Sequence, residues 1–237
     1  MLARAEAGVR AYREVVERML GYPEVNELNT AMHFDGFISC DELCAKLLEI
    51  MERVSGKEVC VVGPLASPDE IRGCNAIMAP EGGVISLLEA GLRPLAVTTD
   101  GDSSLQVFYQ AAEVSDYVLL HIHGDNLNRV SSLAKEIPRS KLLITSQVYT
   151  PYCVYPSGAF TDGDRAIAIS MEMGADEVKV FGFNFDLVSC AHKDYCADTK
   201  LQKLRAGREV LLNIASGLGY SVDIKNNLMV FSRVNKA

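Results

Sequence analysis

Residues 95–120 read LAVTTDGDSSLQVFYQAAEVSDYVLL, in which two short apolar runs, 95–98 and 117–120, flank a spacer of helical length. Buried parallel strands have this continuous apolar character, and a crossover helix usually joins one parallel strand to the next. Similar runs recur on both sides of this stretch, at residues 59–62, 76–79, 142–144 and 178–181. The sequence therefore predicts an α/β fold: a three-layer, Rossmann-like arrangement around a mostly parallel sheet.

The N-terminal part of the chain has a helical pattern instead. Apolar residues three and four apart in residues 2–19 predict a helix that ends near Gly21, and its apolar stripe either packs on the sheet or mediates a homodimer. After a polar connector, Ser39 and Glu42 form a capping-box pattern at the start of a second helix. We expect residues 1–56 to form a helical N-terminal lobe.

Residues 57–237 are expected to form the α/β domain. Its last part does not continue the alternation of strands and helices. Leucines at helical spacing in residues 201–218 predict one long helix that is closed by Gly219. Two apolar segments, 220–224 and 228–231, then flank a pair of asparagines. This arrangement predicts a terminal β-hairpin.

Charge and hydropathy exclude several classes of protein. The chain has 23 Lys and Arg against 31 Asp and Glu, a net charge of −8, and no basic run, which disfavours a nucleic-acid partner. No apolar run approaches the roughly 20 residues that cross a bilayer, and the N-terminus lacks an apolar signal segment. We therefore expect no membrane partner and a cytoplasmic location.

The cysteines are predicted to be free thiols. The chain has 7 of them, an odd number, and it is long enough to form a core without cross-links. This usage is typical of a reducing compartment. Cys40 and Cys44, one helical turn apart, are interpreted as packing residues. Cys190 and Cys196 flank His192 without the closely spaced thiolate pairs of structural zinc sites.

Polar residues follow the predicted strands at the edge where parallel sheets hold their sites. Asp100 and Asp102 come directly after one strand and are separated by a glycine. Hard carboxylate oxygens at this spacing suit Mg²⁺. The alternative is a solvated Asp-Gly turn in which Ser103 and Ser104 cap the next helix.

A second Asp-Gly-Asp segment contains Asp162 and Asp164 and begins a predicted helix. Asp164 is either a favourable first-turn acid or, together with the first segment, part of one metal and phosphate centre. Arg165 would add a bidentate phosphate contact. Residues 146–160 lack a regular pattern and are interpreted as a loop that covers the substrate.

A zinc hydrolase is a competing interpretation. His121, His123 and Asp125 form the His-x-His-x-Asp pattern with which metallo-β-lactamase-like enzymes begin their zinc site. Asn126 stands where that pattern has another histidine. A histidine near a strand end is more often a hydrogen-bonded structural residue than a ligand.

Taken in order, four segments resemble the archaeal type of 6-hydroxymethyl-7,8-dihydropterin pyrophosphokinase, which is related in fold to thiamine pyrophosphokinase. The resemblance extends over about residues 57–205. It is carried by Thr99-Asp100-Gly101-Asp102, His123-Gly124-Asp125-Asn126, Thr145-Ser146-Gln147 and Gly158-Ala159-Phe160-Thr161-Asp162-Gly163-Asp164-Arg165-Ala166. The chain departs from the family pattern at residues 79–83, at Ser103 and at residues 183–185.

The resemblance implies that residues 57–237 form a diphosphokinase domain. Its reaction would be the Mg²⁺-dependent transfer of diphosphate from ATP to a reduced pterin, giving AMP and the pterin diphosphate for tetrahydromethanopterin or folate-type cofactor synthesis. Little covalent help from the protein is needed for such a transfer, but positioning and charge stabilisation are essential. ATP and the pterin would be the small-molecule partners.

The resemblance also implies a set of site residues. The metal ligands would be Asp100, Asp102 and Asp125. The catalytic residues would be Asp100, Asp102, Asp162, Asp164 and Arg165, with Asp162 or Asp164 completing the metal shell or receiving the hydroxyl proton. The residues that bind the nucleotide or pterin would be Gly63, Gly82, Thr99, His123, Asn126, Gln147, Phe160, Thr161, Lys200 and Lys203.

Other functions stay open at this stage. Thiamine pyrophosphokinase has a similar metal loop and would use thiamine as the acceptor. A nucleotide-sugar-binding relative of the same core would not convert ATP to AMP. A regulator that binds ATP without catalysis would also lack AMP formation.

Overall fold

The computed structural model describes residues 2–21, 24–186, 200–225 and 228–234, which contain one sheet in the order β6-β5-β4-β3-β2-β1-β7-β9-β8. Strands β1 to β7 are parallel, β9 is antiparallel to β7, and β8 is antiparallel to β9. The strands are β1 (Glu58–Val62), β2 (Ile77–Pro80), β3 (Ala96–Thr99), β4 (Tyr117–His121), β5 (Leu142–Ser146), β6 (Tyr155–Pro156), β7 (Glu177–Phe181), β8 (Tyr220–Lys225) and β9 (Leu228–Arg233).

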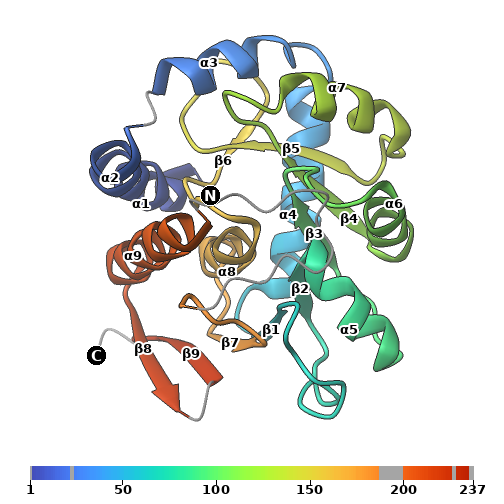
Figure 1. The fold of residues 1–237 in the computed structure, drawn as a ribbon, viewed down its shortest axis with the longest axis vertical. Coiled ribbons are helices and arrows are strands. Elements are labelled where there is room, and N and C mark those ends of the chain that lie inside the picture. The colour runs from blue at the N-terminus through green and yellow to red at the C-terminus, as the bar shows by residue number, and fades with distance from the viewer. Residues whose placement is uncertain (1, 22–23, 187–199, 226–227, 235–237) are drawn as a thin grey trace.

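Helices lie on both sides of this sheet, with α1, α8 and α9 gathered on one side and α5 and α6 on the other (Figure 1). The predicted α/β fold with a mostly parallel sheet is therefore confirmed. The helices are α1 (Leu2–Tyr12), the π-helix η1 (Arg13–Glu17), α2 (Arg18–Leu20), α3 (Glu24–Met32), α4 (Cys40–Val54), the 3₁₀-helix η2 (Glu81–Gly83), α5 (Val84–Glu89), α6 (Leu105–Val114), α7 (Leu127–Glu136), α8 (Asp162–Glu172) and α9 (Lys200–Leu218).

The central strands are buried on both faces, as their continuous apolar runs require. Side chains alternate between the two faces of a strand. In β1, Val59 and Val61 belong to the main core. Cys60 and Val62 belong to a smaller cluster that Leu87 of α5 joins. This double burial explains why the strands show no polar face in the sequence.

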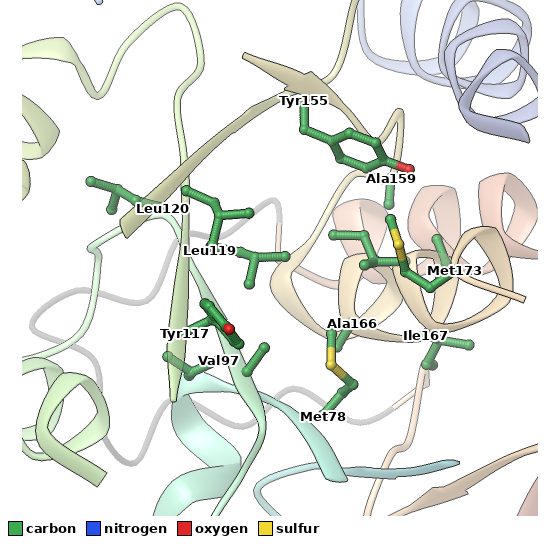
Figure 2. Packing of buried hydrophobic residues seen from close by; sticks show 14 of the residues in the cluster. Met78, Val97, Tyr117, Leu119, Leu120, Tyr155, Ala159, Ala166, Ile167 and Met173 are labelled. Carbon is green, nitrogen blue, oxygen red and sulfur yellow. The ribbon is translucent and has the colours of Figure 1, made fainter. Parts of the chain in front are cut away.

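Helix α8 is the innermost helix, and every residue from Asp164 to Glu172 is buried. Figure 2 shows Met78 of β2 beside Ala166 of α8, with Ile167 and Met173 on the same helical segment. A helix that is buried all round must have partners on every side. The strands β1, β2, β3 and β7 lie on one side of α8 and α9 lies on another. The N-terminus of α8 is thereby held over the carboxyl ends of β2 and β3.

The predicted apolar stripe of the first helix packs into the protein itself. Val9, Tyr12 and Val16 are buried, and Arg4 Nη1 donates to the carbonyl oxygen of Glu172 at 3.4 Å. Val54 of α4 belongs to the same core as the strand residues. The division of the chain at residue 56 stays a prediction.

Local signals in the sequence located several elements correctly. Ser39 and Glu42 form the predicted capping box of α4, and Gly219, with φ of 75°, follows α9 as predicted. The terminal hairpin is β8 and β9. All six predicted strands are present, each within one or two residues of its predicted bounds.

Two elements were not predicted, namely α3 and β6. Helix α3 was interpreted as a polar connector because its buried side carries Glu27 and Thr30, while Val25 and Met32 are exposed. This is the reverse of the usual amphipathic pattern. Strand β6 lies within residues 146–160, and its two residues pair in parallel with β5. Part of the predicted covering loop is therefore an edge of the sheet.

The prediction of free thiols is wrong for four cysteines. Cys40 is disulfide-bonded to Cys153, and Cys60 to Cys74, while Cys44 is free and exposed. The first bridge joins residues 113 positions apart, which no local pattern can indicate. The cysteine-based inference of a reducing compartment loses its support. Cys190, His192 and Cys196 lie outside the described residues. Within those residues, no helix has both the length and the apolar character that a membrane crossing requires.

Candidate active site

Three carboxylates meet at the carboxyl edge of the sheet. Asp100 and Asp102 lie on the loop after β3, and Asp162 begins α8. One oxygen from each lies within 4.8 Å of the others, and all three residues are partly exposed. In the part of the chain that the structure describes, they are the group of His, Cys, Asp and Glu residues placed to hold a metal ion. We call these three residues the acidic triad.

The loop that carries Asp100 and Asp102 is shaped by its own residues. Gly101 has a φ of 76°, in the left-handed region that favours glycine. Oγ1 of Thr99 accepts a hydrogen bond from the Gly101 N–H at 2.9 Å and donates one to the buried carboxylate of Glu81. The Asp102 N–H donates to Oδ1 of Asp100 at 3.1 Å. Thr99, predicted to contact substrate, is thus a buried support of this loop.

Arg129 of α7 holds the same loop from the other side. Its guanidinium donates hydrogen bonds to the carbonyl oxygens of Gly101 and Ser103, which bracket Asp102. Arg129 was not among the predicted site residues. Arg129 lies in no motif, and only the packing of α7 beside the loop brings it there.

Asn126 connects two loops of the site. Its side-chain oxygen accepts a hydrogen bond from the His123 N–H at 3.0 Å. Its Nδ2 donates to the carbonyl oxygens of Asp100 at 3.2 Å and His121 at 2.9 Å. The side chain predicted to bind a substrate edge is used here to join the loops after β3 and β4.

Asp162 is held in place by the residue one helical turn further on. Nη1 of Arg165 donates to Oδ1 of Asp162 at 2.9 Å, and Nη2 donates to the carbonyl oxygen of Ala159 at 3.2 Å. The hydroxyl of Thr98 on β3 donates to the carbonyl oxygen of Asp162 at 2.8 Å. Arg165 is only 1% exposed, so its guanidinium lies beneath Asp162 and not at the surface where a phosphate would arrive.

Asp164 lies apart from the acidic triad. Its carboxylate is fully buried and accepts hydrogen bonds from the N–H groups of Phe160 at 2.7 Å and Thr161 at 2.6 Å, and from the Thr161 hydroxyl. Burial raises the pKa of Asp164, and these hydrogen bonds oppose the shift. Gln147 donates to the Phe160 carbonyl oxygen at 3.4 Å. These contacts form the capping box of α8 and fix the segment that leads into it.

Asp125 also lies outside the acidic triad. Its side chain is 85% exposed and pairs with Nδ1 of His123. This hydrogen bond lowers the pKa of Asp125, and the charge of Lys203 lowers it further. Nε2 of His123 lies 3.9 Å from Oδ2 of Asp100. His123 therefore borders the acidic triad, and Asp125 and Lys203 lie beyond it.

Glu27 of α3 is a buried carboxylate behind the loop after β4. Its Oε1 accepts a hydrogen bond from the Gly124 N–H at 3.3 Å. Burial raises the pKa of Glu27 to about 7, against the opposing charge of His123. The sequence offered no signal for this contact, since α3 itself was not predicted.

The histidine pattern does not form a zinc site among the described residues. His121 is fully buried on β4, with Nδ1 3.0 Å from Oγ1 of Thr145. Burial lowers the pKa of His121 well below its usual value, which keeps the ring neutral. The group placed to hold a metal contains carboxylates only. His121 is thus a buried, hydrogen-bonded structural residue, which was the alternative to a zinc ligand.

A cleft opens beside the acidic triad, where the loop after β1 meets the loop after β7. Strand order changes direction between these two strands, and such switch points are where open parallel sheets bind ligands. The cleft has a volume of about 770 Å³, its open mouth included. We call it the switch-point cleft. It is lined by Pro64, Leu65, Pro80, Gly82, Ser103, Thr161, Asp162, Gly163, Gly182, Phe183, Asn184, Phe185, Lys200 and Leu204.

Four of the predicted site residues, Gly82, Thr161, Asp162 and Lys200, thus line one cleft. Gly63 lies behind its wall, because a Cβ at this position would be 2.7 Å from the ring of Phe183.

The fold and the site define an α/β protein with a carboxylate centre at the carboxyl edge of a parallel sheet. No protein-family model matches the chain. Over 141 residues it is 36% identical to the 6-hydroxymethyl-7,8-dihydropterin pyrophosphokinase of Pyrococcus furiosus, covering 56% of this chain and 59% of that protein. Proteins of the same name from Methanothermobacter thermautotrophicus and Methanocaldococcus jannaschii are 27% and 26% identical over 143 and 158 residues, each covering 60% of this chain.

The predicted resemblance to archaeal pterin pyrophosphokinases is therefore confirmed. The chain spans about 60% of the length of these relatives, between 59% and 63% in the three alignments.

Proposed function

We propose that this protein transfers diphosphate from ATP to 6-hydroxymethyl-7,8-dihydropterin, giving AMP and the pterin diphosphate. One observation carries the proposal. The acidic triad unites both Asp-Gly-Asp segments at a cleft in a chain whose curated relatives are named for this reaction. The same relationship favours a role in the synthesis of a pterin cofactor of the tetrahydromethanopterin or folate type.

In this reaction one bond forms and one bond breaks, both at the β-phosphorus of ATP. The hydroxymethyl oxygen of the acceptor bonds to the β-phosphorus of ATP. The bond from that phosphorus to the oxygen bridging to the α-phosphate breaks, and AMP leaves. The hydroxyl proton passes to solvent or to a carboxylate of the acidic triad. The protein must therefore align the acceptor oxygen, the β-phosphorus and the leaving oxygen.

The acidic triad fits a divalent cation, and we propose Mg²⁺. Its ligands would be Asp100, Asp102 and Asp162, whose carboxylate oxygens suit a hard cation that keeps water and phosphate as its other ligands. When bound, the ion would neutralise phosphate charge, which a chain of net charge −8 otherwise repels.

The remaining residues support this centre. Arg165 fixes the rotamer of Asp162, and Arg129 and Thr99 fix the loop between Asp100 and Ser103. Lys200 lines the switch-point cleft, where it would meet phosphate oxygens. Asp164 acts as a helix cap in this proposal and takes no part in the chemistry.

The test is an assay for AMP with ATP and Mg²⁺, in which the pterin and thiamine are offered separately. We expect equal amounts of AMP and pterin diphosphate, and no AMP with thiamine. Asp102→Asn should abolish turnover. Asp69→Asn is the matched control, because Asp69 is highly exposed and pairs with Arg72 at the surface. AMP with thiamine alone, or full activity of Asp102→Asn, would overturn the proposal.

A further inference from the structure

The switch-point cleft has an apolar end that no predicted site residue explains. Pro64 and Leu65 come from the loop after β1, Phe183 and Phe185 from the loop after β7, and Leu204 from α9. These are apolar side chains from three separate elements, gathered around one opening. Small-molecule ligands bind in clefts that are lined mainly by apolar and aromatic side chains, with a few polar groups among them.

Phe183 is held firmly in this wall. A Cβ at Gly163 would lie 2.2 Å from the ring of Phe183, and a Cβ at Gly63 would lie 2.7 Å from it. The ring therefore occupies space that only two glycines leave free. Phe185 is stacked beside it, with ring centroids 6.4 Å apart and an interplanar angle of 25°. A fixed aromatic ring is a suitable surface for a flat ligand, because little side-chain entropy is lost on binding.

The switch-point cleft and the acidic triad share a residue, and the Phe183 ring lies against Gly163, the residue that follows it. Asp162 lines the switch-point cleft and is also one of the three carboxylates of the triad. A ligand on the apolar wall is therefore close to the place where phosphate chemistry would occur. Ser103 and Asn184 also line the cleft and offer polar groups to the edge of a heterocycle.

The separation between the ring and the reacting atom decides which of the two substrates fits the apolar end of the cleft. In the acceptor a single methylene separates the ring from the reacting oxygen. In ATP the adenine is separated from the β-phosphorus by the ribose and the α-phosphate. A ring pocket that borders Asp162 suits the acceptor, whereas the adenine must lie further from the triad.

We propose that the apolar end of the switch-point cleft is the acceptor-ring pocket, in which Phe183 and Leu65 contact the face of the reduced pterin. This inference rests on the proposed function. It assigns the pterin to the side of the site between β1 and β7, and it makes Phe183 a specificity-determining residue.

The test uses two variants and two ligands. Leu65→Trp adds bulk at the apolar end of the cleft, and it should fold because Leu65 is 46% exposed. Phe183→Ala removes the ring. Leu48→Trp is the matched control on α4, since Leu48 is also 46% exposed and lies outside the cleft. For each protein, the Kd of 6-hydroxymethylpterin is measured from its own fluorescence, and the Kd of Mg²⁺-ATP by calorimetry.

We expect both cleft variants to raise the Kd of the pterin by about tenfold or more, the scale of one lost stacking contact. The Kd of Mg²⁺-ATP should stay within about twofold of wild type, and Leu48→Trp should change neither constant. Weaker binding of Mg²⁺-ATP alone would place adenine in the pocket and overturn the assignment. So would unchanged binding of the pterin by Leu65→Trp.

The wild-type protein separates this inference from the proposed function. If it forms pterin diphosphate while Leu65→Trp still binds the pterin normally, the function stands and the pocket assignment falls. If the wild type neither binds the pterin nor forms its diphosphate, both fall.

Discussion

Arg165 donates a hydrogen bond to Asp162 at 2.9 Å from a position that is itself almost completely buried. The guanidinium of Arg165 therefore orients the carboxylate of Asp162, one of the acidic triad. Asp162 also lines the switch-point cleft. A residue that resembled a phosphate ligand in the sequence is better described as a support for Asp162, which we propose as a metal ligand.

Replacing Arg165 should weaken metal binding more than it weakens ATP binding. Arg165→Lys cannot donate to both Asp162 and the carbonyl oxygen of Ala159 in the same geometry, so the rotamer of Asp162 is released. Loss of such a support typically lowers metal affinity by about 10 to 100-fold. Titration of Mn²⁺ followed by electron paramagnetic resonance measures this effect. Unchanged Mn²⁺ affinity in a folded Arg165→Lys protein would contradict it.

Arg129 should matter for the other half of the acidic triad. Arg129→Gln removes the hydrogen bonds that bracket Asp102, and we expect kcat to fall by about tenfold or more while the protein stays folded. Arg72→Gln is the surface control, because Arg72 is 74% exposed. The two are compared by steady-state kinetics and circular dichroism. Equal kcat values for the two variants would show that the loop with Asp100 and Asp102 keeps its shape without the hydrogen bonds from Arg129.

Asp164 and Asp102 should respond in opposite ways. Asp164→Asn weakens the capping box of α8, so the free energy of unfolding should fall by about 1 to 3 kcal/mol, while folded molecules stay active. Asp102→Asn relieves repulsion within the acidic triad, and we expect unchanged or higher stability without turnover. Urea unfolding and the AMP assay on the same samples measure both quantities. Loss of activity in an Asp164→Asn protein that stays stable would show that Asp164 takes part in the reaction.

Stability should decrease as the pH rises from about 4.5 to about 8 because of Glu172. This carboxylate is buried, accepts a hydrogen bond from the Tyr155 hydroxyl at 2.9 Å, and has its pKa raised by burial from 4.5 to about 8. Between these two pH values, the folded state keeps a proton on Glu172 that the unfolded state has released. The contribution of Glu172 to stability is therefore complete below about pH 4.5, and it is lost as the pH rises to about 8.

The matched pair of variants for this effect is Glu172→Gln and Glu209→Gln. Glu172→Gln should remove most of the fall in Tm between about pH 4.5 and about pH 8, since the side chain no longer ionises. Glu209 is an exposed surface residue paired with Arg18, and its variant should follow the wild type. A Glu172→Gln profile that parallels the wild type would assign the pH dependence to other groups.

The disulfides should be visible in peptide maps. Without reductant, Cys40 should be found linked to Cys153 and Cys60 to Cys74, while Cys44 reacts with a thiol reagent. Reduction should lower the free energy of unfolding, and the longer bridge should contribute about 4 to 5 kcal/mol because it closes the longer loop. Reaction of Cys40 and Cys153 in the untreated, folded protein would exclude the first bridge.

Local physical chemistry explains what the sequence by itself determined about this protein. Apolar runs indicate strands buried on both faces, and capping residues such as Ser39 mark helix ends, because these signals depend on neighbours within a few positions. The order of strand ends also predicted that Asp100 and Asp102 would lie at the carboxyl edge. The four ordered motifs then indicated the family resemblance that the curated relatives confirm.

Tertiary structure decided which of the candidate residues face the cleft. Asp162 and Asp164 are two positions apart on α8, yet one joins the acidic triad and the other caps the helix in the interior. Arg129 and Glu27 reach the site from helices whose sequence contains no motif. Cys153 finds Cys40 across 113 positions. Such contacts depend on how α3, α4, α7 and α8 pack around the sheet, and this packing is a property of the whole core.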